Sequence, residues 1–286
     1  METINTSGSN TKIKKNISRA IVYVITAVLS LIFLVPFLWM LFTSFKSFEE
    51  IYRYPPTILP EKFYFNNYFL AVTKMPFLRY LLNTVVITVL CVIGTVTSSS
   101  MVAYSMSKIK WKGSKYLFPL IIGTMMIPSQ VTMIPLYLVF TKLNMVGTIT
   151  PLVLPAFLGS AYYIFLLRQF FKTIPDSLVE SATIDGAKDF TIFLKIIIPL
   201  CKPAITSVAI FTFLNSWSDF LGPLLYLNKD EQYTLSLGLQ AFMQTHFVEW
   251  GPMMAASAIF TVPIIILFFF AQSYFIEGIT ITGIKG

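Results

Sequence analysis

Charged residues are scarce in this chain. Only 12% of its 286 residues are Asp, Glu, Lys or Arg, about half the share of roughly 25% in a typical soluble domain. Hydrophobic residues make up 56% of the sequence. A soluble domain needs charged surface to cover its core, so this composition excludes a disordered chain, a secreted disulfide scaffold and an ordinary cytosolic enzyme. An integral membrane protein remains.

Residues that carry enzyme chemistry are also few. The chain has two cysteines and a single histidine, His246, and no spacing of these residues that would hold a metal ion. It contains no glycine-rich phosphate loop ending in Gly-Lys-Ser or Gly-Lys-Thr, so it does not bind ATP by that route. The formal net charge of +8 indicates membrane topology rather than a nucleic-acid partner.

Long uncharged stretches are what the sequence does have. Six of them exceed the roughly 20 residues that a helix needs to cross the hydrocarbon core, and only Asp219 interrupts any of them. They predict an all-α protein with six transmembrane helices. The first is too long for the apolar core of a signal peptide, about 7–15 residues, and is interpreted as an uncleaved span. The six stretches cover residues 20–45, 80–107, 116–141, 143–167, 203–228 and 250–276.

The basic residues predict the orientation. With the N-terminus inside, 14 of the 21 Lys and Arg residues fall in cytoplasmic segments and 7 in external ones, although the first external loop holds five of those seven. This bias places both termini in the cytoplasm of a cell-membrane protein. The predicted organisation is a cytoplasmic tail (1–19), a first transmembrane helix (20–45), an extracytoplasmic loop (46–79), a five-helix core (80–276) and a cytoplasmic tail (277–286).

One polar cytoplasmic segment, residues 171–202, has the pattern of a folded unit. Ser177 and Glu180 have the spacing of a capping box at a helix start. Gly186 is a natural helix stop, and a second short helix is expected from Asp189 to Ile198. The pattern alone fits either an interfacial hairpin that caps the helix bundle or a docking site for another protein.

The same segment carries a specific resemblance. Glu180-Ser-Ala182-Thr-Ile-Asp185-Gly186-Ala187, followed by Ile197-Ile-Pro199-Leu200, resembles the cytoplasmic loop motif of ABC importer permeases. Ser181 replaces the usual first Ala of the motif, and Ile198 replaces the usual Leu before Pro199. The stretch Trp217-Ser-Asp219-Phe-Leu-Gly-Pro223 resembles the fifth helix of carbohydrate importer permeases, and the C-terminal tail resembles that of the maltose-type second permease subunit. The resemblance covers the chain from about residue 20 to its end.

The resemblance implies a type I ABC importer permease fold and a non-catalytic transport role. It implies a second permease subunit as the partner in a heterodimer, two ATPase subunits that bind ATP and Mg²⁺ in place of this chain, and an extracytoplasmic binding protein that delivers a sugar or oligosaccharide. The rigid helix pair would pass an ATPase movement to the spans that it connects. The implied ATPase-docking residues are Glu180, Ala182, Asp185, Gly186, Ala187 and Pro199.

Asp219 is the only acidic residue inside a predicted span. A charge in the bilayer is costly, so it should face a cavity or a pairing group. With Asn215, Trp217 and Ser218 it would suit a sugar path, since an aromatic face packs on C–H groups while amides and hydroxyls bind sugar hydroxyls. An interhelical hydrogen bond, or a carboxylate reaching toward the outer surface, is the alternative.

The C-terminal tail bears glycines and is poorly suited to a regular helix. It is either a frayed end or, as the resemblance implies, a segment that contacts the ATPase through Gly283, Lys285 and Gly286. His246 is expected to be a surface residue of the outer segment between the last two spans.

The sequence leaves three alternative functions open to different degrees. The same importer architecture could carry a peptide or a polyamine. A secondary transporter working alone should show inverted repeats and coupling carboxylates within spans, and one intramembrane acid argues against it. A membrane enzyme would need a catalytic constellation that this residue inventory does not offer.

Overall fold

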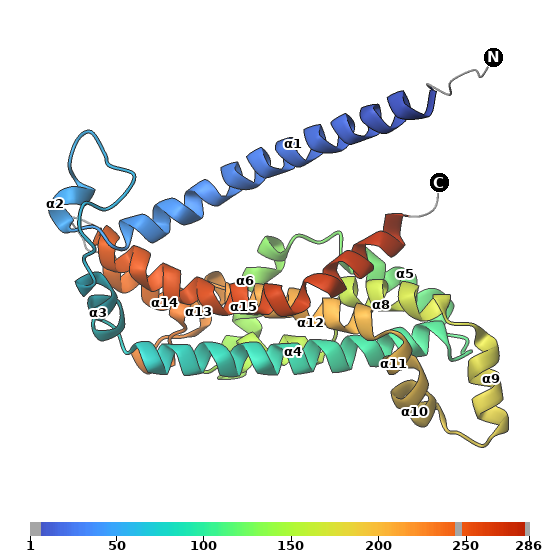
Figure 1. The fold of residues 1–286 in the computed structure, drawn as a ribbon. Coiled ribbons are helices and arrows are strands. Elements are labelled where there is room, and N and C mark those ends of the chain that lie inside the picture. Colours follow the sequence, from blue (N-terminus) through green and yellow to red (C-terminus); the bar gives the residue numbers. More distant parts are fainter. Residues whose placement is uncertain (1–6, 244–247, 284–286) are drawn as a thin grey trace, which may run out of the picture. The chain divides into compact units, whose positions relative to one another are not determined.

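The computed structural model describes the backbone of residues 7–243 and 248–283 and the side chains of residues 16–243 and 248–272. The chain divides into two compact units. Unit 1 comprises Met1–Ala71 and Gln244–Ile259, and unit 2 comprises Val72–Met243 and Phe260–Gly286. Helices build both units (Figure 1), which confirms the predicted all-α class.

Within the described residues, four helices are long and apolar enough to cross a membrane, and up to six spans result if each of two bent helix pairs counts as one. The four are Asn16–Thr43, Phe77–Ser107, Thr150–Thr173 and Trp250–Gln272. The bent pairs are Ser114–Thr124 with Ser129–Lys142, which meet at 100°, and Asp189–Leu200 with Lys202–Trp217, which meet at 83°.

Unit 1 contains α1 (Ser7–Thr43), α2 (Phe48–Ile51), most of α3 (Asn66–Thr73) and the start of α15 (Trp250–Gly283). From residue 16 to residue 36 every side chain of α1 is exposed. An apolar helix with no covered face needs lipid or another chain around it. The segment after α1 is compact, because the Asn67 side chain donates hydrogen bonds to the carbonyls of Ser44 (2.9 Å) and Lys46 (2.8 Å).

Unit 2 is organised around α4 (Phe77–Ser107), which packs against α7 (Thr150–Phe157), α8 (Ala161–Thr173) and α12 (Lys202–Trp217) (Figure 1). Small residues let these helices approach closely. A Cβ at Gly94 would come within 2.7 Å of the Phe157 ring. Ser98 donates to the carbonyl of Ala156 at 2.8 Å. Ser98 of α4 thus bonds directly to the backbone of the neighbouring helix α7.

Three predicted spans are broken by local backbone chemistry. The stretch 116–141 splits into α5 (Ser114–Thr124) and α6 (Ser129–Lys142), since Pro128 is extended (ψ 137°) and disfavours helix at the residue before it. The stretch 143–167 becomes helical only at Thr150, because Asn144 (φ 55°) and Gly147 (φ 82°) adopt left-handed conformations. The stretch 203–228 breaks after Trp217 and resumes as α13 (Leu221–Tyr226).

Short elements complete unit 2. The segment 171–202, predicted to be cytoplasmic, forms α9 (Asp176–Ile184), α10 (Asp189–Ile192), one π-helical turn η1 (Phe193–Ile197) and α11 (Ile198–Leu200). After α13 come η2 (Asp230–Gln232), α14 (Leu235–Gly238) and η3 (Leu239–Phe242), of which α14 is entirely buried.

Candidate functional site

The segment that carries the motif is a tightly turned helix pair. After α9, Gly186 takes φ +81°, and its amide donates to the carbonyl of Thr183 at 3.0 Å. The amide of Ala187 donates to the carbonyl of Ala182 at 2.9 Å. These two bonds form a Schellman motif, which needs a left-handed residue at the position of Gly186. The predicted glycine break is confirmed in position, and it is a fixed turn.

The start of α9 differs from the prediction. The helix begins at Asp176, one residue before Ser177, and no side chain caps its first turn. The predicted capping box of Ser177 and Glu180 is therefore wrong. Pro175 (φ −58°, ψ 134°) leads the chain into the helix in an extended conformation, and Asp176 places a negative charge at the positive end of the helix dipole.

A salt bridge ties the start of α9 to the end of α4. The ammonium of Lys108 lies 2.6 Å from an Asp176 carboxylate oxygen and donates to the carbonyl of Ile174 at 2.5 Å. The Lys108 side chain is 2% exposed and that of Asp176 is 71% exposed. The hydrogen bond from Lys108, together with its positive charge, lowers the pKa of Asp176. The carboxylate therefore stays ionised at neutral pH and the contact persists there.

Sequence reasoning missed this contact. It counted Lys108 only as a topology signal, because Asp176 lies 68 positions further along the chain. The available signal was a lysine just after one predicted span and an aspartate at the start of the predicted helix in the segment 171–202.

The helix pair rests on the main apolar cluster of unit 2. Five residues of this cluster are fully or almost fully buried: Leu167 and Phe171 of α8, Ile192 of α10, Ile197 of η1 and Val208 of α12. Val179, Ala182 and Ala187 pack against the cluster with half-buried side chains. The pair therefore shares one apolar cluster with α8 and α12.

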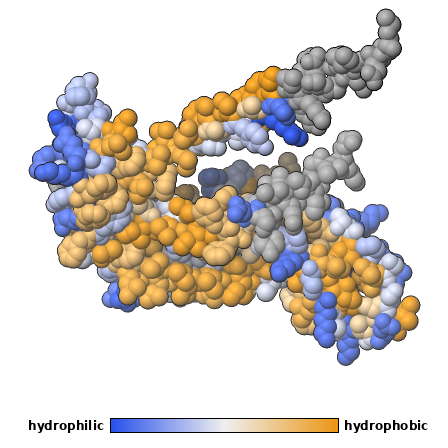
Figure 2. Space-filling view, in the orientation of Figure 1, coloured by the Kyte–Doolittle hydropathy of each residue, from blue (hydrophilic) through white to orange (hydrophobic). Residues whose placement is uncertain are grey.

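The opposite face of the pair is open. Glu180 and Asp185 are exposed, and Ile184 is 86% exposed. Figure 2 shows hydrophobic surface bordered by hydrophilic residues over the region that α9 and α10 occupy in Figure 1. This face of the pair therefore presents both apolar and acidic side chains to its surroundings.

The second helical run extends further than predicted, to Leu200 rather than Ile198. It then meets α12 at 83°. Pro199 and Pro203 stand four residues apart at this bend, and Pro203 has no amide to donate to the carbonyl of Pro199. Pro199 itself lies exposed within α11 and marks the corner between the helix pair and the span.

The four predicted path residues lie at the end of α12 in different environments. Asn215 is exposed and donates to the Tyr163 hydroxyl at 3.3 Å, and Ser218 is exposed. Asp219 is half-buried, and its carboxylate accepts from the amide of Gly222 at 3.1 Å. This bond satisfies a backbone amide in the first turn of α13, so Asp219 has a local structural role that neither sequence interpretation included.

Trp217 is 3% exposed. Its indole stacks on Phe213 (5.3 Å between ring centroids) and Phe260 (5.8 Å), and its N–H donates to the Phe260 carbonyl at 3.2 Å. In this chain the indole is a packing group between α12 and α15.

Substitutions at Trp217 test that role. Trp217→Phe should keep the stacking and leave transport within about twofold of the unchanged chain. Trp217→Ala should lower the free energy of unfolding by about 3–5 kcal/mol through the cavity that it leaves. Thermal unfolding in detergent and solute uptake are the measurements. A Trp217→Phe variant of normal stability that transports a different range of solutes would instead place the indole on the path.

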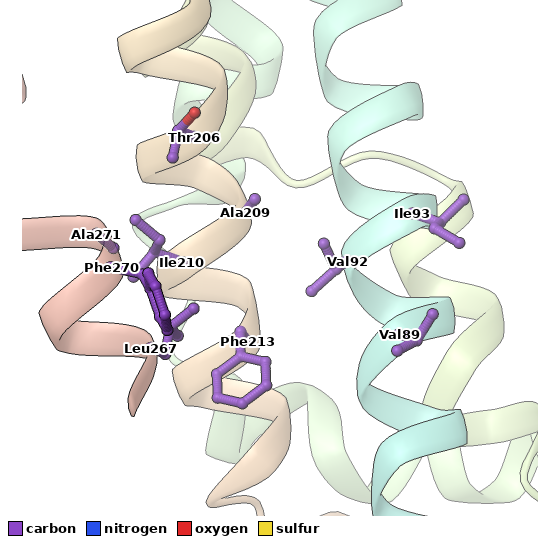
Figure 3. Close-up of a pocket in the computed structure, with 10 residues that line it drawn as sticks. All are labelled: Val89, Val92, Ile93, Thr206, Ala209, Ile210, Phe213, Leu267, Phe270 and Ala271. Carbon is purple, nitrogen blue, oxygen red and sulfur yellow. The ribbon is translucent and has the colours of Figure 1, made fainter. Parts of the chain in front are cut away.

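An apolar cavity of about 390 Å³ lies between α4, α12 and α15 (Figure 3). Thr206 supplies the one hydroxyl among its lining side chains. Such a lining suits hydrocarbon and offers little to a sugar hydroxyl, so this cavity does not serve as the predicted path. Its lining residues are Val89, Val92, Ile93, Thr206, Ala209, Ile210, Phe213, Leu267, Phe270 and Ala271.

The predicted C-terminal contact is only partly described. Helix α15 continues to Gly283, so the prediction that the tail is unsuited to a regular helix is wrong up to that residue. Lys285, Gly286 and the histidine His246 lie outside the described residues.

Comparisons with known proteins agree with this geometry. Residues 94–281 match the family model described as "Binding-protein-dependent transport system inner membrane component". The arabinooligosaccharides transport system permease protein AraQ of Bacillus subtilis is 34% identical over 261 residues, covering 90% of this chain and 92% of that protein. The diacetylchitobiose uptake system permease protein NgcG of Streptomyces coelicolor is 30% identical, covering 87% of this chain and 83% of that protein.

A solved structure shares the fold. A chain of a bacterial ABC transporter involved in the import of the acidic polysaccharide alginate superposes with a TM-score of 0.78 at 24% sequence identity, covering 92% of this chain and 98% of that chain. Residues 94–281, which the family model matches, include the helix pair from Asp176 to Leu200 and the helices on either side of it. The chain therefore belongs to the family of inner membrane components of binding-protein-dependent transport systems.

Proposed function

We propose that this chain is one of two permease subunits of an ATP-driven importer and forms half of the path for a sugar or oligosaccharide. A second, related permease subunit would complete the path. Two ATPase subunits would bind ATP and Mg²⁺ beneath the membrane, and an extracytoplasmic protein would deliver the sugar. Both termini would lie in the cytoplasm, in keeping with the 14 of 21 basic residues on that side.

The helix pair from Asp176 to Leu200 carries the proposal. A surface that is to receive force from an ATPase must be rigid, or the movement is lost within it. Here the Schellman turn at Gly186 fixes one end, the Lys108–Asp176 contact fixes the other, and the apolar cluster supports the pair between them. Glu180, Ile184 and Asp185 would face the ATPase.

Two weaker elements belong to the same proposal. Asn215, Ser218 and Asp219 would lie near the path, while Trp217 would support them from behind. Gly283, Lys285 and Gly286 would reach the ATPase subunits.

A sugar is favoured over other solutes by the relatives. AraQ and NgcG are named for the transport of arabinooligosaccharides and the uptake of diacetylchitobiose. Both match nearly the full length of the chain at 30–34% identity, so the spans as well as the cytoplasmic motif are shared. A peptide or polyamine importer would share the cytoplasmic motif for the same mechanical reason, which makes the cargo a matter for experiment.

Reconstitution tests the proposal. The chain, expressed with its neighbouring transport genes, should co-purify with an ATPase and a second permease. Proteoliposomes that contain this complex and the binding protein should accumulate arabinotriose or diacetylchitobiose only when ATP is supplied on the side of the membrane where the ATPase subunits lie. Uptake of a tripeptide or spermidine instead would overturn the sugar assignment. Uptake by the purified chain alone without ATP would overturn the importer.

A further inference from the structure

A second cavity lies in unit 1, where α1 ends and α15 begins. Its volume is about 290 Å³. Two indoles, Trp39 and Trp250, form part of its wall, together with Thr43, Lys46, Glu50 and Tyr52. This volume is at the lower end of the range for small-molecule sites, roughly 300–1,000 Å³. In the proposed orientation the cavity faces the outer side of the membrane.

The two charged groups in the wall are buried and held in place. Lys46 is 3% exposed and Glu50 is 9% exposed. The Lys46 ammonium donates to the carbonyl of Thr57 and lies 5.0 Å from the centre of the Trp39 ring. The Glu50 carboxylate accepts from the Thr57 hydroxyl at 3.0 Å and from the amide of Glu61 at 2.9 Å. These contacts fix the loop and set both charged groups at the cavity wall.

Polar groups in the cavity wall can form hydrogen bonds beyond those present in the structure. The Thr43 hydroxyl oxygen is buried and has no hydrogen-bond partner in the described part of the chain. Both bonds to Glu50 go to the same carboxylate oxygen, Oε1, and an ammonium group has three donors. A buried hydroxyl without a partner has lost its hydrogen bonds to water and gained none in exchange, which is unfavourable. A ligand that bonds this hydroxyl would recover that cost.

The chemistry of the wall selects the ligand class. One positive and one negative group make the cavity electrically neutral, so an ion would gain from one group and be opposed by the other. A neutral polyhydroxyl ring needs no charge to be desolvated. Its hydroxyls can meet the carboxylate, the ammonium and the threonine hydroxyl while its C–H face packs on an indole.

We propose that this cavity is an accessory site for a single ring of a neutral sugar on the outer face of the permease, separate from the residues at the end of α12. The inference rests on the proposed function and adds a site to it. Such a site would hold one end of an oligosaccharide beside the permease while the remainder is passed from the binding protein. The competing occupant is a zwitterionic lipid headgroup at the membrane boundary.

Tryptophan fluorescence of the permease–ATPase complex in detergent, without binding protein, measures occupancy directly. Arabinotriose and diacetylchitobiose are titrated separately, and at least one of them should change the fluorescence saturably. Thr43→Val should weaken the apparent affinity about three- to tenfold, because it removes the hydroxyl and keeps the shape. Trp250→Leu should weaken it by about tenfold or more. Trp111→Leu, at an exposed tryptophan of unit 2, is the matched control and should bind as the unchanged complex does.

Three outcomes would overturn the site: no saturable change, equal affinity in Thr43→Val and the unchanged complex, or a saturable change with dihexanoyl phosphatidylethanolamine that sugar does not displace. ATP-driven uptake separates this failure from that of the proposed function. Uptake without the fluorescence response refutes only the accessory site. A response without uptake of either sugar supports the site and refutes the sugar importer.

Discussion

Valine in place of Gly186 should reduce ATP-driven uptake by about tenfold or more and weaken the association with the ATPase, while insertion into the membrane is unchanged. A Cβ at this position would meet no atom within 4 Å, so crowding is not the cause. The cause is the backbone, since φ of +81° costs a residue with a side chain roughly 1–2 kcal/mol, and a β-branched residue is worse placed there. The chain would leave the Schellman turn, and α9 would lose its fixed position.

Two variants separate backbone strain from added bulk. Gly123→Val in α5 also places its side chain in open space but has an ordinary backbone angle, so it should transport normally. Gly186→Asn should retain most of the activity, because asparagine tolerates the left-handed region. Uptake and the amount of ATPase recovered with the purified chain are the two measurements. Normal uptake by Gly186→Val would show that the turn has no part in coupling.

Lys108→Met should give the second large effect, about a tenfold fall in uptake with a higher rate of ATP hydrolysis per solute carried. The lysine side chain is 2% exposed and bonds both Asp176 and the Ile174 carbonyl. Hydrogen bonds to charged groups contribute about 1.5–3 kcal/mol each. Methionine fills the same space without either bond, so the start of α9 is released from α4.

Three further variants separate the loss of the contact with α9 from a general loss of positive surface charge. Lys108→Arg keeps the charge and should recover much of the coupling. Asp176→Asn should have a smaller effect, because its side chain is largely exposed and the bond to Ile174 survives. Lys112→Met, at an exposed lysine four positions further along the chain, should behave as the unchanged chain. Equal losses in Lys112→Met and Lys108→Met would point to the charge of the surface rather than to the contact with α9.

The pH dependence of this contact follows from the same pair. The pKa of Asp176 is below its ordinary value because of Lys108. A depressed carboxyl pKa stabilises the folded state above the ordinary value of about 4, and that stabilisation is lost as the pH falls through the lower pKa. Between pH 5 and 8 the contact is therefore constant.

Composition and local pattern determined much of this protein in advance. The shortage of charge and the long apolar stretches placed it in the membrane, since a bilayer demands such stretches whatever surrounds them. Gly186 indicated a helix end from the sequence alone, because the left-handed conformation that ends a helix depends on the local backbone. The family motif from Glu180 to Pro199 was readable for the same reason: its residues lie close together along the chain.

Tertiary structure decided what depends on distant partners. The contact between Lys108 and Asp176 joins residues from different helices, and no local pattern identifies such a pair. The sequence around Trp217 suggested a sugar-binding aromatic residue, but in the fold its indole packs against Phe260. The cavity of unit 1 is lined by the end of α1, the segment that follows it and the start of α15, which lie far apart in the sequence. Local sequence sets backbone geometry and membrane preference, whereas the role of a polar or aromatic side chain is set by what the fold brings within a few ångströms of it.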